Sequence, residues 1–159
     1  MKSRRLIPLL LMVLLMIGVQ AIAEISEDTL KVEAGKPLPS EKGLYFSRGE
    51  KGFVNLRIED NQFAVIFLNS EKEVVQPENL VDVLLIAEAI RGEDDRENFL
   101  LRASPSGLLY SHPRYIKKPY HYRVKVRVTF TEQFQTPTTA SGHDNKEVVE
   151  EFGFAMLKQ

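Results

Sequence analysis

The segment from Tyr120 to Phe130 limits the possible folds more than any other part of the chain, because its polarity alternates without a break. One face carries the apolar and aromatic side chains Tyr122, Val124, Val126, Val128 and Phe130. The other face carries His121, Arg123, Lys125, Arg127 and Thr129. A period of two over this length is typical of an antiparallel strand with one face on a core and the other in water. We therefore predict a β-rich fold.

Further strand patterns precede this segment and are separated by turn signals at close intervals. Residues 52–59 alternate in polarity, and Asp60 and Asn61 then tolerate the left-handed backbone of a tight hairpin. Residues 62–68 are apolar on both faces, which is typical of a central strand covered on two sides. Residues 81–90 fit either helix or strand spacing, and their β-branched content favours a strand.

These patterns indicate an all-β fold, an antiparallel immunoglobulin-like β-sandwich of about seven strands with turns roughly every 8–12 residues. The expected core consists of Val54, Leu56, Ile58, Phe63, Val65, Phe67, Leu85, Leu100, Val124, Val126 and Val128. The chain has no cysteine, so no disulfide reinforces the fold and the core must hold it unaided. It also lacks the tryptophan typical of antibody domains.

We divide the 159 residues into four parts. Residues 1–23 are an export leader, and residues 24–42 are a polar, extended lead-in in which an edge strand near Leu30 and Val32 stays possible. The β-sandwich occupies residues 43–131. Residues 132–159 read as a flexible acidic tail, with a final edge strand as the alternative for its end.

The first 23 residues have the three features of a signal peptide. A positive start (Lys2, Arg4 and Arg5) precedes the apolar stretch 6–19, and the small residues of 21–23 follow. The apolar run of roughly 14 residues is shorter than the ~20 that span a bilayer. We expect cleavage after Ala23 and a periplasmic or secreted protein. The alternative is an uncleaved leader, which would then provide the only membrane contact.

Charge and cysteine content exclude several functions. The whole chain has 21 basic and 22 acidic residues, and without the three basic residues of the leader the balance is 18 against 22, a net −4. A mildly acidic protein is a poor nucleic-acid binder, because binding needs many cations that neutralise phosphates. The absence of cysteine excludes thiolate zinc sites, iron–sulfur clusters and a cysteine nucleophile.

The stretch from Tyr110 to Arg127 is the main candidate for a binding surface. It holds four of the five tyrosines and two of the three histidines, and six cations with no acid lie between Arg114 and Arg127. Aromatic rings beside cations suit an anionic glycan, a phosphate-bearing surface or an acidic protein. We predict partner contacts by Tyr115, Lys117, Lys118, His121, Arg123, Lys125 and Arg127. The structural alternative is a loop in which Tyr120 or Tyr122 caps a sheet corner by hydrogen bonding.

Two chemical alternatives have weaker support. A metal site would use His112, His121 and His143 with Asp144, but no pair has diagnostic ligand spacing. Ser111 beside His112 suggests a serine–histidine pair, yet the sequence has no GxSxG elbow and no apparent oxyanion-hole segment. We therefore expect a protein that is not an enzyme and uses no cofactor.

Three stretches within residues 43–131 carry a resemblance to known proteins, namely 61–75, 106–111 and 122–126. In them the chain resembles small exported, periplasmic immunoglobulin-like β-sandwich proteins of Gram-negative bacteria. Some proteins of this kind accompany metal-efflux or other envelope transport components. The resemblance implies an accessory role and transfers no site residues.

The leading hypothesis is a non-enzymatic periplasmic domain that contacts a cell-envelope protein or an anionic envelope surface through the basic and aromatic stretch. The alternative is a periplasmic metal-binding accessory protein of a metal-efflux system. A purely structural, anchored domain would follow if the leader is not cut.

Overall fold

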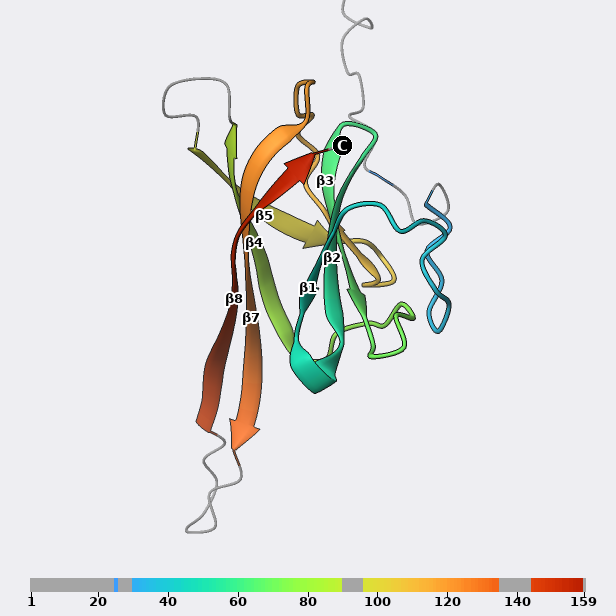
Figure 1. The fold of residues 1–159 in the computed structure, drawn as a ribbon. Coiled ribbons are helices and arrows are strands. Elements are labelled where there is room, and N and C mark those ends of the chain that lie inside the picture. Colours follow the sequence, from blue (N-terminus) through green and yellow to red (C-terminus); the bar gives the residue numbers. More distant parts are fainter. Residues whose placement is uncertain (1–24, 26–29, 90–95, 135–143, 159) are drawn as a thin grey trace, which may run out of the picture.

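A computed structural model describes residues 25, 30–89, 96–134 and 144–158 (Figure 1). Its strands are β1 (Leu44–Ser47), β2 (Phe53–Glu59), β3 (Gln62–Leu68), β4 (Leu80–Ala89), β5 (Arg96–Ala103), β6 (Leu109–Ser111), β7 (His121–Phe134) and β8 (Asp144–Lys158). A single 3-10 turn, η1 (Gly49–Lys51), joins β1 to β2. The predicted leader with its cleavage site, and His143, lie outside the described residues. Within the described residues no helix is long and apolar enough to cross a membrane.

The strands form one antiparallel sheet in the order β1-β2-β3-β6-β5-β4-β7-β8. The sheet curls until its edge strands β1 and β8 approach each other, so it is nearly closed into a barrel (Figure 1). In the described part of the chain no backbone ladder joins those two strands. The all-β, antiparallel prediction is confirmed.

The immunoglobulin-like arrangement of two separate sheets is not confirmed. A short ladder between β5 and β6 joins the two halves, pairing Arg102 with Ser111 and Ala103 with Tyr110. The halves β1-β2-β3-β6 and β5-β4-β7-β8 still face each other across a common core, as the layers of a sandwich do.

The main core lies between these halves and contains all but one of the residues predicted for it. The exception is Leu100, whose side chain is 57% exposed. Its neighbours Phe99 and Leu101 are buried instead, at 2% and 5% exposure. Successive side chains of a strand point to opposite faces, so reading β5 one residue out of phase reverses every side chain in it.

A second apolar cluster covers the outer face of β3, all of whose residues are buried, as the sequence predicted. The lead-in supplies Ile25 and Val32 to this cluster, and Leu30 and Leu38 pack against it. Leu30 and Val32 therefore contribute packing to the outside of the sheet and do not form an edge strand.

Buried polar groups fasten the end of the lead-in to β2. The Arg57 side chain is almost fully buried and donates to Asn55 Oδ1 at 2.7 Å and to the Ser40 carbonyl at 2.7 Å. The Asn55 amide in turn donates to the Lys42 carbonyl at 3.1 Å. Buried polar groups are costly unless they are hydrogen-bonded, so these contacts fix where the lead-in meets the sheet.

The tail prediction needs correction, because residues 144–158 form the long edge strand β8, the alternative weighed for them. Leu157 is buried in the main core and Phe152 packs against it. A bulge places Gly153 and Phe154 opposite Lys125, since Val124 pairs with Ala155 and Val126 with Phe152. Dispersed acidic residues made this segment look like a solvated tail, although its residues Phe152 and Leu157 contact the core.

Candidate functional site

The loop between β6 and β7 is held against the β2–β3 hairpin. Asp60 and Asn61 have φ values of 46° and 62°, which confirms the predicted tight turn. The Ile116 amide donates to the Asn61 carbonyl at 2.7 Å, and the Tyr120 hydroxyl donates to Asn61 Oδ1. The Gln62 side-chain amide also donates to the Pro113 carbonyl at 3.3 Å. The loop therefore has a defined position over one end of the barrel.

Beneath this loop lies a cavity of about 280 Å³, which we call the terminal hollow. Its floor consists of Ala87 and Ala89 from β4 and Phe99 from β5. The inward row of β4 runs through the larger Val83 and Leu85 before reaching these alanines. Because small residues end that row, the interior is left unfilled at this end.

The rim of the terminal hollow is rich in cations and aromatic rings. Tyr115, Lys117, Lys118 and His121, four of the seven predicted contact residues, lie around it. Tyr115 is half exposed and both lysines are exposed. Among the residues that the structure describes, no carboxylate lies within ion-pair distance of either lysine.

The acid of the terminal hollow already has a cationic partner. Arg114 Nη2 lies 3.0 Å from Glu97 Oε1, and the Arg114 guanidinium is 5.9 Å from the centre of the Phe99 ring. Arg114 and Glu97 were absent from the predicted contact residues. Their signal in the sequence was weak, because Arg114 was one of six cations and Glu97 one of 22 acidic residues.

Tyr122 forms a wall of the terminal hollow and also has a structural role. Its hydroxyl donates to the Lys117 carbonyl at 3.3 Å, five residues upstream, as the tyrosine-corner alternative requires. Burial, with smaller contributions from Glu97 and Tyr120, raises the pKa of Tyr122 above its ordinary value. The phenol therefore stays neutral at physiological pH.

His112 lies beside the terminal hollow and is neutral. Burial, followed by the charges of Arg102 and Arg114, lowers the pKa of His112. Its Nδ1 accepts a hydrogen bond from the Arg114 backbone amide at 3.1 Å, which requires that nitrogen to be unprotonated. In the described part of the chain, no group of three histidine, aspartate or glutamate side chains is arranged to hold a metal ion.

The other three predicted contact residues, Arg123, Lys125 and Arg127, lie on the outer face of β7 and pair with acids of adjacent strands. Arg123 lies 3.8 Å from a Glu88 oxygen. Lys125 Nζ lies 2.7 Å from Glu151 Oε2, and Arg127 Nε donates to Glu151 Oε1 at 2.6 Å. Each of these cations therefore has an acidic partner on the sheet, although Lys125 and Arg127 share Glu151, and none of the three joins the rim.

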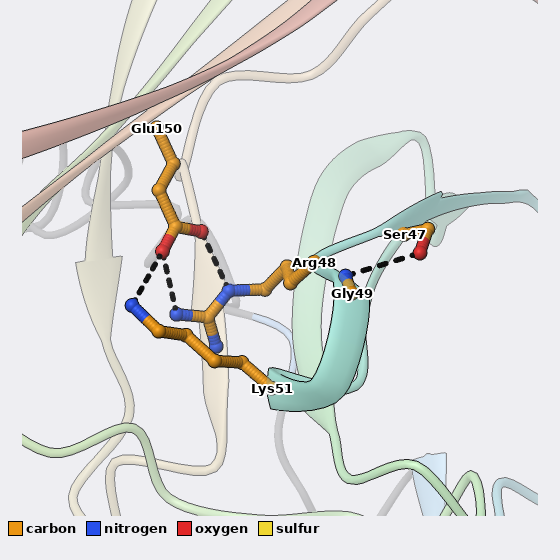
Figure 2. A network of polar contacts seen from close by, with 5 residues as sticks. All are labelled: Ser47, Arg48, Gly49, Lys51 and Glu150. Atoms are coloured by element: carbon orange, nitrogen blue, oxygen red, sulfur yellow. Dashed lines mark hydrogen bonds and ion pairs between the residues drawn. The ribbon is translucent and has the colours of Figure 1, made fainter.

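The opposite end of the barrel is closed by a buried cation, Arg48, at the far end of β2 from the hairpin (Figures 1 and 2). Its side chain is 8% exposed and binds both carboxylate oxygens of Glu150 on β8, at 2.7 and 3.2 Å. Lys51 lies 3.5 Å from the same carboxylate. The Arg48 guanidinium also covers the Phe130 ring at 4.7 Å. We call this arrangement the Arg48 seal.

The Arg48 seal bridges the gap between the two edge strands. Phe46 of β1 and Phe152 of β8 add a ring contact there, with centroids 5.4 Å apart. Burial alone would raise the pKa of Glu150, but hydrogen bonds and charge from Arg48 and Lys51 outweigh it and hold the pKa below its ordinary value of 4.5. Arg48 and Glu150 are 102 residues apart, so no local sequence pattern links them.

Comparison with known proteins identifies no relative: the chain matches no family model, no curated protein and no solved structure. The resemblance to small exported β-sandwich proteins therefore stays a prediction. The function has to be inferred from the residues around the terminal hollow.

Proposed function

We propose that the protein is a non-enzymatic, exported binding protein of the bacterial cell envelope that contacts an acidic segment of another envelope protein at the terminal hollow. Its export rests on the signal-peptide features of residues 1–23. A cationic mouth on a mildly acidic protein attracts acidic segments and orients their approach. Tyr115, Lys117, Lys118 and His121 are the proposed contact residues.

One observation carries this proposal: the rim lysines have no acidic partner among the described residues, whereas the cations of β7 do. An acidic partner gains charge complementarity at Lys117 and Lys118 without displacing any ion pair formed by the residues that the structure describes. At Arg127 it would first have to compete with Glu151. The proposed binding surface is therefore narrower than the seven residues that the sequence suggested.

The loop that carries the lysines is also suited to recognition. Its hydrogen bonds to the β2–β3 hairpin position the rim before a partner arrives. A pre-positioned loop loses little conformational freedom on binding, and this loss is one of the main costs of association. Tyr115 adds an exposed ring of a residue type enriched at protein interfaces.

The test is cross-linking of the tagged full chain in intact envelopes, with two charge-reversed variants. K117E/K118E reverses the rim, and K36E/K72E reverses two exposed lysines of the lead-in and the β3–β4 connection as a matched control. We expect the unaltered chain and the control to yield the same cross-linked envelope protein and K117E/K118E to lose it. Identical patterns in all three, or no cross-linked protein with the unaltered chain, would contradict the proposal.

A further inference from the structure

The terminal hollow has a buried, apolar lining at its floor and an exposed, charged lining at its mouth. Ala87 and Phe99 of the floor are each 2% exposed, and Ile116 of the covering loop is 8% exposed. The charged side chains Lys117 and Lys118 are exposed at the mouth. A ligand that reached the lysines alone would leave the partly exposed Ala89 and Tyr122 of the lining in contact with water.

The volume of the terminal hollow indicates the size of the missing group. Its 280 Å³ corresponds to roughly nine water molecules, at about 30 Å³ each. A side chain such as phenylalanine or leucine is smaller than this, so the hollow admits one such side chain with room left for the backbone beside it. Interface hot spots cluster in well-packed pockets surrounded by contacts that exclude water, and large aromatic side chains are common among them.

We infer that the acidic segment carries one large apolar anchor residue between its acids, and that this anchor enters the terminal hollow and covers its floor while the flanking carboxylates meet Lys117 and Lys118. This inference rests on the proposed function and specifies the partner's chemistry. An anionic lipid surface fits less well, because a bilayer presents its charged groups first and keeps its apolar chains behind them. In the hollow, by contrast, the apolar group of the ligand must enter more deeply than its charged groups.

The floor offers a way to remove the anchor site without changing charge. Ala89 is the last residue of the inward-facing row of β4, and it lies opposite Tyr122 of β7. Replacing Ala89 by leucine places three more carbon atoms in the hollow. Ala89→Val is a milder version of the same change, useful if the leucine variant does not melt cooperatively.

The experiment is a calorimetric titration of the full chain with three capped five-residue peptides. The first has a central phenylalanine between two pairs of glutamates. The second replaces the phenylalanine by serine, and the third replaces the four glutamates by glutamines. We expect the first peptide to bind at least tenfold more tightly than either comparator.

The variants assign each preference to a part of the site. A89L should weaken the phenylalanine–glutamate peptide at least fivefold and leave the serine peptide unchanged. K117E/K118E should weaken both glutamate peptides at least tenfold, and K36E/K72E should leave them unchanged. If neither Ala89 variant folds, the comparison of the three peptides on the unaltered chain decides alone.

Equal binding of the phenylalanine and serine peptides would overturn the inference, as would full binding to a folded A89L protein. Binding of phosphatidylglycerol vesicles in preference to all three peptides would also overturn it. Failure of the proposed function looks different: cross-linking in envelopes would not depend on Lys117 and Lys118, even if the peptides behaved as expected.

Discussion

Both ends of the barrel carry cations paired with acids, but among the described residues the open end also carries two lysines that have no ion pair. At the sealed end, Arg48 and Lys51 share Glu150, which β8 brings from the far end of the sequence. At the open end, Lys117 and Lys118 border the terminal hollow, where the described acid, Glu97, pairs with Arg114 and not with either lysine. The same kind of side chain therefore stabilises the fold at one end and is available to a partner at the other.

Burial explains the difference. Arg48 is enclosed, and a buried charge is costly unless an opposite charge and hydrogen bonds compensate for it. The rim lysines remain in water, where their charge needs no partner within the protein. Mutations at the sealed end should therefore act on stability, and mutations at the rim should act on binding.

The largest expected effect is at the sealed end. Arg48→Ala should lower the free energy of unfolding by about 2 to 3 kcal/mol, because Glu150 loses its bidentate partner and Phe130 its cation. Lys51→Ala is the control, since the Lys51 side chain is 61% exposed and should contribute less than about 0.5 kcal/mol. Urea unfolding measures both. Equal effects of the two substitutions would show that the seal does not depend on burial.

The next effect concerns Glu150 and acid. Glu150→Gln should cost about 1 to 2 kcal/mol at neutral pH, because Arg48 then faces a neutral group. Since the pKa of Glu150 is lower in the folded than in the unfolded chain, its contribution is complete above its ordinary value of 4.5 and is lost as the pH falls through the lowered folded value. Urea titrations over this acidic range should show a shallower loss of stability in the variant. Parallel pH profiles of the unaltered chain and the variant would contradict the assignment of this acid-dependent stability to Glu150.

A smaller effect is expected where the loop is anchored. Tyr120→Phe removes the hydroxyl that bonds Asn61 and should cost about 0.5 to 1 kcal/mol. The Ile116 amide, which bonds the same turn, should exchange its hydrogen faster. Tyr115→Phe is the matched control, because the half-exposed Tyr115 side chain has no hydrogen bond within the described structure. Similar exchange rates in both variants would mean that the hydroxyl does not hold the loop.

The smallest effect on stability should come from the rim itself. K117E/K118E should change the free energy of unfolding by no more than about 0.5 kcal/mol, because both side chains are exposed and form no ion pair within the described residues, and the one ring contact, of Lys118 with Tyr120, is at the surface. Thermal and urea unfolding supply the measurement. A loss above about 1 kcal/mol would place these lysines in the structural group with Arg48.

Local patterns predicted some elements of the fold and not their arrangement. The strand at 120–130 and the Asp60–Asn61 turn follow from the preferences of a few neighbouring residues, so the local sequence predicts both. Residues 144–158 were read as a flexible tail because their acids suggested solvation. Only pairing with β7 reveals that Glu151 faces Lys125 and Arg127. The prediction that Leu100 lies in the core is wrong, because the neighbouring strands decide which face of β5 points inward and a local pattern does not show them.

The sequence predicts the rim of the candidate site but not its floor. Its rim residues are close in sequence, so the loop cations and Tyr115 could be identified from composition alone. The floor combines Ala87 and Ala89 with Phe99 from the neighbouring strand, and only the register between β4 and β5 brings these residues together. The contact of Arg123 with Glu88 could not be predicted either, because it depends on pairing between distant segments.

The most direct test of the contrast between the ends is an NMR titration of the unaltered full chain with sodium sulfate at constant ionic strength. Sulfate reports which cations accept an anion without requiring a particular partner. We predict saturable amide shifts in residues 114–122 and unchanged amides in residues 48–51 and 123–127. Saturable shifts of equal size around the Arg48 seal, or no saturable shift in the loop, would contradict the assignment of the two ends.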